Sequence, residues 1–292
     1  MKFVNFEKDN EIRIGVKTET GILDLQEAGQ KFNETVPNSM EELIRKNDLS
    51  QIKLIVERAE RDAVNLDILS EEEITFAPCL LNPGKVVCVG LNYLSHIEEA
   101  KTVDIPEEPV LFSKFNNTLA AHHENIPIPK VGEKFDYEAE LVIVIGKEAQ
   151  HVSEEEALSY VFGYSVGNDL SVRDLQFVSS QWLLGKSPDK FAPVGPYLVT
   201  ADEIDPTNLD IALKLNGETV QSSNTKHMIF NCSTIISYIS KHFTLQPGDL
   251  IFTGTPEGVI LGYPEDQQVW LKSGDKLEVV IENIGTLENT FG

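Results

Sequence analysis

The sequence predicts a mixed α/β protein dominated by β-strands, with a small N-terminal domain in residues 1–77 and a larger domain in residues 78–292. Three observations support this class. Short β-branched and apolar runs recur along the whole chain, an Asn-Gly pair at residues 216–217 separates two of them, and helical spacing of apolar residues is confined to a few segments. With 292 residues and 41% apolar content, the chain can bury a large core.

Charge and cysteine content restrict the partners and the cellular setting. Lys and Arg total 24 against 47 Asp and Glu, so the formal charge is 24 − 47 = −23, which argues against nucleic acid and anionic membranes as partners. The three cysteines lack metal-type spacing and suggest a reducing compartment: Cys79, Cys88 and Cys232. There is no apolar signal region and no run near the ~18 apolar residues of a membrane span. We therefore expect a cytoplasmic protein.

The N-terminal domain is expected to be structural. Strand-like runs cover residues 2–6, 12–17 and 21–25, and two helical patterns follow. The first begins after Ser39, with Glu42 three residues later as in a capping box. The second spans residues 49–64. No histidine, paired carboxylate in an apolar setting or Gly-rich loop occurs before residue 75.

A strand is predicted over residues 85–90, followed by a helix that starts near Asn92. On that helix His96 and Glu99 are three residues apart and therefore neighbours. A carboxylate beside an imidazole raises the pKa of the imidazole and fixes its orientation, as in many general bases. From the spacing alone, a surface ion pair on a polar helix is the commoner arrangement and therefore the favoured alternative.

Residues 135–147 are predicted to form one long strand. Side chains alternate along a strand, so Glu138 and Glu140 share a face, roughly 7 Å apart at the backbone. The following run is apolar on both faces, which indicates a buried strand. Two unpaired buried carboxylates would take up protons, whereas a hard divalent cation would keep them charged. In the alternative, Glu138 is solvated and Glu140 pairs with Lys or Arg.

More charged residues follow the next strands, after a predicted strand at residues 109–114. The strand at residues 160–169 ends in Asp169, which can turn toward a neighbouring strand. Arg173 and Gln176 lie three residues apart just beyond it. Lys186 is flanked by small residues and is expected in a Gly/Pro-rich loop, where binding groups often lie. Ordinary surface charge is the alternative for both cations.

The C-terminal part continues with strands and one helix. Residues 209–221 predict a β-hairpin around the Asn-Gly pair, and residues 232–243 an amphipathic helix. The strand from residue 250 ends at Thr255, whose hydroxyl and nearby backbone N–H groups suit a carboxylate. Residues 274–284 predict a turn and a last strand. Neither a P-loop nor a dinucleotide-binding fingerprint occurs.

These segments, taken in order, resemble the fumarylacetoacetate hydrolase family. The matching motifs are GLNYLSHIEEA, EPVLFSK, DYEAELVIVIGK, GYSVGNDLSVRDLQ, GKSPDKFAPVGP, LNGE, MIF and LQPGDLIFTGTPEGV. They cover about residues 78–292, roughly three quarters of the chain. The resemblance implies a rolled β-sandwich with few helices beside a small N-terminal domain, and a homodimer.

The resemblance also implies the site. It implies Mg²⁺, Mn²⁺ or Ca²⁺ on Glu138, Glu140 and Asp169. His96 and Glu99 would form a water-activating pair on a lid. The remaining implied roles are a positive group beside the reacting oxygen and groups that hold substrate oxygens: Lys186, then Arg173, Gln176 and Thr255. One departure is GKSPDKF where the family often has GKSFDTF; the extra charge at Lys190 bears on substrate size or polarity rather than on the metal.

The predicted function is metal-dependent hydrolysis of a C–C bond in an acylpyruvate or related diketo acid, through a metal-stabilised enolate. The substrate would be a small anionic 2-oxo acid. The same enolate chemistry supports oxaloacetate decarboxylation, or isomerisation or decarboxylation of 2-hydroxy-dienoic diacids in aromatic degradation. The pair His96 and Glu99 favours hydrolysis, because decarboxylation consumes no activated water. A catalytically silent metal-binding protein is the alternative of another class.

Overall fold

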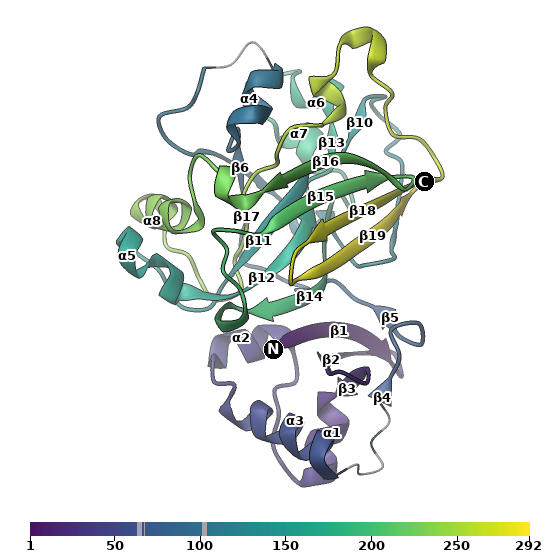
Figure 1. The fold of residues 1–292 in the computed structure, drawn as a ribbon, viewed down its shortest axis with the longest axis vertical. Coiled ribbons are helices and arrows are strands. Elements are labelled where there is room, and N and C mark those ends of the chain that lie inside the picture. Colours follow the sequence, from purple (N-terminus) through teal and green to yellow (C-terminus); the bar gives the residue numbers. More distant parts are fainter. Residues whose placement is uncertain (63–65, 67, 101–103) are drawn as a thin grey trace.

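The computed structural model describes residues 1–62, 66, 68–100 and 104–292, and its main element is a mixed 12-stranded sheet (Figure 1). Two short strands pair at its sides with β1 and β14: β5 (Thr75–Phe76) and β8 (Leu119–Ala120). The other ten run in the spatial order β4 (Ile68–Leu69), β3 (Ile22–Asp24), β2 (Glu11–Lys17), β1 (Lys2–Lys8), β14 (Ala192–Thr200), β12 (Val161–Asn168), β11 (Ala139–Ile145), β17 (Leu250–Phe252), β6 (Val86–Gly90) and β7 (Val110–Lys114). Strands distant in sequence therefore lie side by side.

A second sheet of five strands packs on one face of the large sheet. Its order is β16 (Glu218–Asn224), β15 (Asp210–Leu215), β18 (Asp275–Ile281), β19 (Gly285–Phe291) and β9 (Asn125–Ile126). One core cluster joins Leu141 and Ile143 of β11 to Leu213, Val279 and Leu287 of the second sheet. This packing forms the sandwich that the sequence analysis expected.

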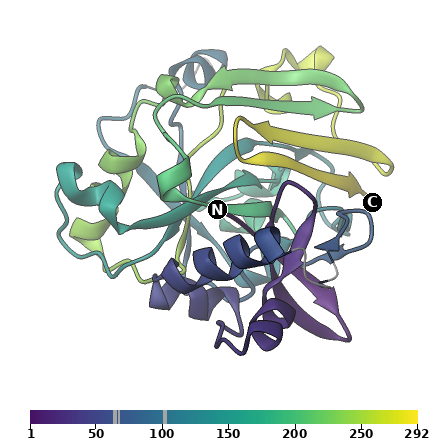
Figure 2. The same cartoon turned by 60° about the horizontal axis from the view of Figure 1, so that its bottom comes forward.

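The opposite face of β11 belongs to a second core cluster. Val142 and Val144 lie there with Phe3, Leu43 and Ile55 of the N-terminal segment. Figure 2 shows the resulting layers, with the small sheet above the large sheet and the N-terminal helices below it. Strand β11 is thus buried on both faces, as its apolar run predicted.

The N-terminal segment contains three helices: α1 (Leu25–Phe32), α2 (Met40–Lys46) and α3 (Ser50–Asp62). The predicted cap of α2 is confirmed, since Ser39 Oγ accepts the N–H of Glu42 at 3.2 Å. Residues 63 and 64, which we placed in the next helix, lie outside the described residues. Strand β1 pairs with β14 through Phe3 and Leu198. The domain boundary at residue 77 stays a prediction.

The remaining helices are short: α4 (Leu94–Ala100), α5 (Glu154–Ala157), α6 (Arg173–Gln176), α7 (Leu183–Lys186) and α8 (Cys232–His242). Single 3₁₀ turns are η1 (Asn116–Thr118), η2 (Leu158–Tyr160), η3 (Ala201–Glu203), η4 (Thr225–His227), η5 (Ile260–Gly262) and η6 (Glu265–Gln267). None of the helices in the described ranges combines the length and hydropathy that a bilayer crossing requires.

One strand prediction was wrong and another was incomplete. Residues 135–147 form two strands, because β10 (Phe135–Asp136) pairs with β13 (Ser171–Val172) whereas β11 pairs with β12 and β17. The chain changes partners at Glu138, whose N–H donates to the side-chain oxygen of Asn168 at 3.0 Å instead of joining a ladder. The turn and strand predicted at residues 274–284 are present as Gly274 and β18, but β18 is not the last strand, because it forms a hairpin with β19 that turns at Asn283 (φ 62°). The hairpin of β15 and β16 is confirmed, with φ of 53° at Asn216 and 86° at Gly217.

Candidate active site

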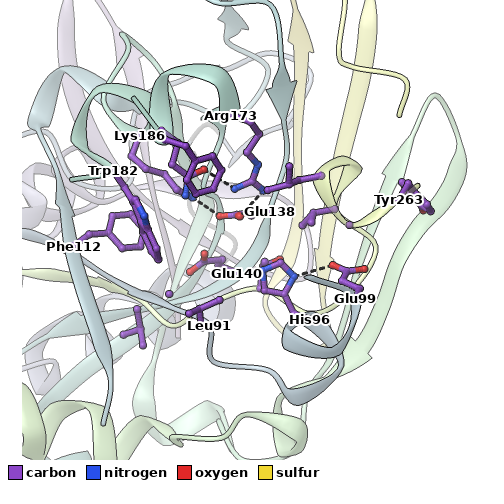
Figure 3. Close-up of a pocket in the computed structure, with 18 of the residues that line it drawn as sticks. Leu91, His96, Glu99, Phe112, Glu138, Glu140, Arg173, Trp182, Lys186 and Tyr263 are labelled. Atoms are coloured by element: carbon purple, nitrogen blue, oxygen red, sulfur yellow. Dashed lines mark hydrogen bonds and ion pairs between the residues drawn. The ribbon is translucent and has the colours of Figure 1, made fainter. Parts of the chain in front are cut away.

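A cavity of about 570 Å³ opens beside the ends of β6, β11 and β17. Eight of the nine residues that the sequence predicted for the site line it, and Figure 3 shows the charged ones converging from several elements. The ninth, Asp169, is fully buried next to them. The structure therefore brings the whole predicted set together.

Three buried carboxylates meet at this cavity. Glu138 precedes β11, Glu140 lies within it, and Asp169 directly follows the antiparallel neighbour β12. One oxygen atom from each of the three lies within 4.8 Å of the others. Their relative exposures are 5%, 2% and 0%, so water does little to screen their mutual repulsion.

Two lysines neutralise part of this charge. Lys186 Nζ donates to Glu138 Oε2 at 2.5 Å and to Asp169 Oδ2 at 2.8 Å. Lys114 donates to the other oxygen of Asp169 and, at 3.0 Å, to the carbonyl of Leu170. Burial lowers the pKa of Lys186, but the charges of Asp169 and Glu138 outweigh that effect and raise it, so its ammonium form is retained.

One arginine completes the set of cations. Arg173 Nη2 donates to Glu138 Oε1 at 2.7 Å, and Arg173 Nε donates to Asp136 Oδ2 at 2.8 Å. Burial alone would raise the pKa of Glu138, but Lys186 and Arg173 hold it below its ordinary value. The ionised form of Glu138 is thus maintained at neutral pH.

Charge counting leaves one carboxylate without a cation. The cluster has three cations and four carboxylates, 3 − 4 = −1: Lys114, Arg173 and Lys186 against Asp136, Glu138, Glu140 and Asp169. Glu140 accepts the N–H of Gly254 at 2.7 Å and, among the described residues, forms no ion pair. Burial, then the charges of Asp169 and Glu138, raise its pKa well above the ordinary value. An all-oxygen donor set with excess negative charge fits Mg²⁺, Mn²⁺ or Ca²⁺.

The surface-charge alternatives were wrong. Lys186 ends helix α7 and is 2% exposed, rather than lying in a loop, and Arg173 is also buried, at 4%. A Cβ on Gly185 would lie 2.5 Å from the backbone nitrogen of Gln176, so only glycine lets α7 pack on α6 and turn Lys186 inward. The alternative for the acidic pair, a solvated Glu138 and a Glu140 paired with Lys or Arg, was also wrong. Glu138 forms ion pairs with Arg173 and Lys186, whereas Glu140 forms none among the described residues.

The predicted pair on α4 is formed. His96 Nδ1 and Glu99 Oε1 lie 2.8 Å apart, and Glu99 Oε2 accepts the N–H of Gly258 at 2.9 Å. Ser95 also donates to Glu257, so α4 is fixed to the 257–262 segment at two points. A carboxylate that faces Nδ1 favours the tautomer with the proton on Nδ1, which leaves Nε2 as the acceptor. This arrangement suits a general base.

Two predicted substrate-binding residues, Gln176 and Thr255, form hydrogen bonds that the sequence analysis did not predict. Gln176 Oε1 accepts from Arg173 Nη1 at 2.9 Å. Thr255 Oγ1 accepts from Gln221 Nε2 at 3.0 Å. Gln221 lies on the hairpin strand β16, and no spacing rule connects it to Thr255.

An aromatic wall closes one side of the cavity. The rings of Phe112 and Trp182 meet edge to face, with centroids 5.3 Å apart, and Lys186 Nζ lies 5.1 Å from the Phe112 centroid. A Cβ on Gly90 would lie 2.5 Å from Trp182, so glycine makes room for the indole. Lys190 lies outside this wall and pairs with Glu124 at 2.9 Å.

Comparisons with known proteins identify the family of this chain. The profile described as "Fumarylacetoacetate (FAA) hydrolase C-terminal" matches residues 85–292. The chain belongs to the fumarylacetoacetate hydrolase family. A "Fumarylacetoacetate hydrolase domain-containing protein 2 homolog" of Dictyostelium discoideum is 44% identical over 95% of this chain and 92% of its own length. A mitochondrial oxaloacetate tautomerase of Bos taurus is 40% identical over 92% of this chain and 83% of its own.

Solved members of the family have the same fold. The fumarylacetoacetate hydrolase of Exiguobacterium antarcticum has a TM-score of 0.83 and 34% identity, over 100% of this chain and 99% of its own. The maleylpyruvate hydrolase of Sphingobium sp. SYK-6, solved in complex with manganese(II) and pyruvate, has a TM-score of 0.78 and 28% identity, over 100% and 98%. The homodimer that the family resemblance implied stays a prediction.

Gly262 is expected to be essential for the pair on α4 in this family member. A Cβ there would lie 2.6 and 2.8 Å from the two carboxylate oxygens of Glu99. Gly262→Ala should therefore displace Glu99 and lower turnover by about tenfold or more, while the metal affinity stays within about threefold. Steady-state kinetics and Mn²⁺ titration measure the two quantities. Gly217→Ala, in an open hairpin turn, controls for the loss of a glycine; equal effects of both changes would contradict the assignment.

Proposed function

We propose that this chain is a divalent-metal-dependent enzyme that interconverts the keto and enol forms of oxaloacetate or a similar short 2-oxo diacid. The observation that carries the proposal is the cation-free carboxylate of Glu140, which shares one cavity with the pair His96 and Glu99. Relatives of about 40% identity over most of the chain are named oxaloacetate tautomerases, which supports this reaction over the others.

Glu138, Glu140 and Asp169 would hold the ion. A divalent cation would change the charge of the whole cluster of four carboxylates and three cations from −1 to +1. When bound, the ion supplies positive charge to the carboxylate and 2-oxo oxygens of the substrate. A local positive charge is required because the whole chain carries −23 and would otherwise repel a dianion.

The side chains have separate roles in the proton transfer. His96 Nε2 would accept a proton from C3, and the electron pair of that C–H bond would become the C2–C3 double bond. The C2=O π electrons would move onto the oxygen, which would take a proton from solvent, and His96 would return its proton to solvent. Glu99 would stabilise the imidazolium through Nδ1. Lys186 has three N–H donors and uses two on carboxylates, so one remains for the developing enolate oxygen. Arg173, Gln176 and Thr255 would orient the substrate.

Hydrolysis of an acylpyruvate is the second candidate, and two observations favour it. A structural relative is named maleylpyruvate hydrolase and holds manganese and pyruvate. The cavity of about 570 Å³ falls in the range of about 300–1,000 Å³ that accommodates drug-sized ligands, and a four-carbon diacid is much smaller. In this reaction His96 would deprotonate water instead of C3, as the sequence analysis proposed.

The test is to mix the protein with enol oxaloacetate and to follow the enol absorbance by stopped flow, with Mg²⁺ and then with EDTA. Pyruvate release from oxaloacetate and from an acylpyruvate is measured in parallel, and Mg²⁺ alone is the blank. We expect metal-dependent enol loss without pyruvate. Pyruvate mainly from the acylpyruvate would establish the hydrolase instead, and pyruvate mainly from oxaloacetate a decarboxylase. No change in any assay would refute the enzymatic proposal.

A further inference from the structure

Asp136 is a fully buried carboxylate outside the predicted site and outside the cavity lining. Its Oδ1 accepts the N–H of Tyr137 at 2.9 Å and of Ile260 at 2.8 Å. Its Oδ2 accepts Arg173 Nε at 2.8 Å and the N–H of Leu261 at 3.1 Å. Four N–H donors converge on this one carboxylate. Removal of the carboxylate would therefore leave all four without their acceptor.

On one side, these contacts lead to the metal carboxylates. Asp136 fixes the guanidinium of Arg173, whose other end donates to Glu138 at 2.7 Å. Without Asp136, the side-chain partners left to Arg173 among the described residues would be Glu138 and Gln176. The position of Glu138 therefore depends on a residue that does not touch the cavity.

On the other side, the contacts lead to the general base. Asp136 holds the backbone of the 258–262 segment at Ile260 and Leu261. The same segment donates the Gly258 N–H to Glu99, and Glu99 faces Nδ1 of His96. The hydroxyl of Tyr137 adds a bond to the Gly258 carbonyl at 3.1 Å.

We propose that Asp136 is a positioning residue that fixes the metal carboxylates and the His96–Glu99 pair in one mutual geometry. A carboxylate is required because only it offers four acceptor sites without a donor. In Asp136→Asn, the amide nitrogen would face two N–H donors in either orientation, and both contacts would become repulsive. The two donors would be those of Arg173 and Leu261 in one orientation and those of Tyr137 and Ile260 in the other. The catalytic part of this inference rests on the proposed function, whereas the effect on His96 does not.

The first readout is the protonation site of His96, measured by ¹⁵N NMR of the imidazoles with Mg²⁺ and without metal. In the wild type, we expect Nδ1 to carry the proton, because Glu99 Oε1 lies 2.8 Å from it. We expect Asp136→Asn to release Glu99 and to give a mixture of the Nδ1–H and Nε2–H forms. An unchanged His96 spectrum in this variant would overturn the proposal, even if the wild type turns over no oxaloacetate.

The second readout is a double-mutant cycle with Glu99→Gln on kcat. Asp136→Asn should lower kcat by about 10–100-fold in the wild-type background. In the Glu99→Gln background, the same change should cost less than in the wild type, because the part of its effect that acts through Glu99 is already lost while the part that acts through Arg173 and Glu138 remains. Fully additive losses would overturn the link to Glu99. Failure of the wild type to react would instead refute the proposed function.

Two further variants separate positioning from folding. Asp249 is an equally buried carboxylate that binds Lys85 at 2.7 Å and the N–H of Gln246 at 2.8 Å, away from the cavity. Asp249→Asn should lower the melting temperature yet leave the His96 spectrum and kcat within about twofold of the wild type. If Asp136→Asn does not fold, Tyr137→Phe removes only the bond to the Gly258 carbonyl and should shift the same His96 signals. A wild-type spectrum in Tyr137→Phe would then count against the proposal.

Discussion

Glu140→Gln is expected to abolish divalent-metal binding and the activity that depends on it. Glu140 is the one carboxylate of the cluster with no cation, so its charge is the one that a metal ion compensates. Loss of a unit charge near the ion at an effective dielectric constant of about 20 is worth about 4 kcal/mol, or about a thousandfold in affinity. Calorimetric Mn²⁺ titration measures this loss. Tight Mn²⁺ binding by the variant would contradict the site assignment.

The same substitution is expected to stabilise the metal-free protein. Burial and the neighbouring carboxylates raise the folded-state pKa of Glu140, so folding favours its protonated form. Protonation of Glu140 therefore stabilises the folded state. This contribution is fully present below the pKa of Glu140 in the unfolded chain, and it is lost as the pH rises through the pKa of Glu140 in the folded protein. At the alkaline end of this range, the EDTA-treated variant should melt about 2–4 °C above the wild type, and the difference should disappear at low pH. Glu124→Gln, at the Lys190 ion pair, is the control.

His96→Ala should retain metal binding and lose turnover. The imidazole contacts Glu99 and, in the part of the chain that the structure describes, forms no hydrogen bond to the three carboxylates, so the Mn²⁺ affinity should stay within about threefold. Removing a positioned general base typically costs about 10²–10⁴-fold in rate. Enol loss and Mn²⁺ titration on the same sample separate the two effects, and Glu99→Gln should give an intermediate loss. Wild-type turnover by His96→Ala would refute its role, and the exposed His123→Ala controls for a histidine change.

Much of the candidate site was predictable because its residues lie in local patterns. Alternation placed Glu138 and Glu140 on one face, and helical spacing placed His96 beside Glu99. Both contacts follow from a few consecutive residues. The order of the family motifs then linked Asp169 and Lys186 to them.

The missed residues depend on contacts between distant segments. Lys114 ends a strand and meets Asp169, 55 positions later, and Asp136 binds Leu261, 125 positions later. No local pattern shows which distant group a buried charge will meet. The sequence therefore suggested which carboxylates lie together, but not that three cations would pair with the other carboxylates and leave Glu140 without an ion pair in the described part of the chain.

The missed elements have comparable causes. Helix α1 contains Gly29, which lowers helix propensity. A Cβ at Gly29 would lie 2.9 Å from Val36, so packing against the following segment requires the glycine. Strand β19 buries Asn289, which donates to the carbonyls of Ala121 and Glu124 at 2.9 and 2.8 Å. In both cases a tertiary contact outweighs the local preference.

The pairing of β1 with β14 also affects how the chain can be made. The ribosome synthesises β1 before β14, so Phe3 cannot pair with Leu198 until 195 further residues have been added. At about 5–20 residues per second, that interval is about 10–40 s, during which the outer edge of β1 lacks this partner. Strand β11 likewise cannot pair with β17 until that later strand has been synthesised. The ordered central sheet can therefore be completed only late in synthesis, and the nascent chain must avoid aggregation until then.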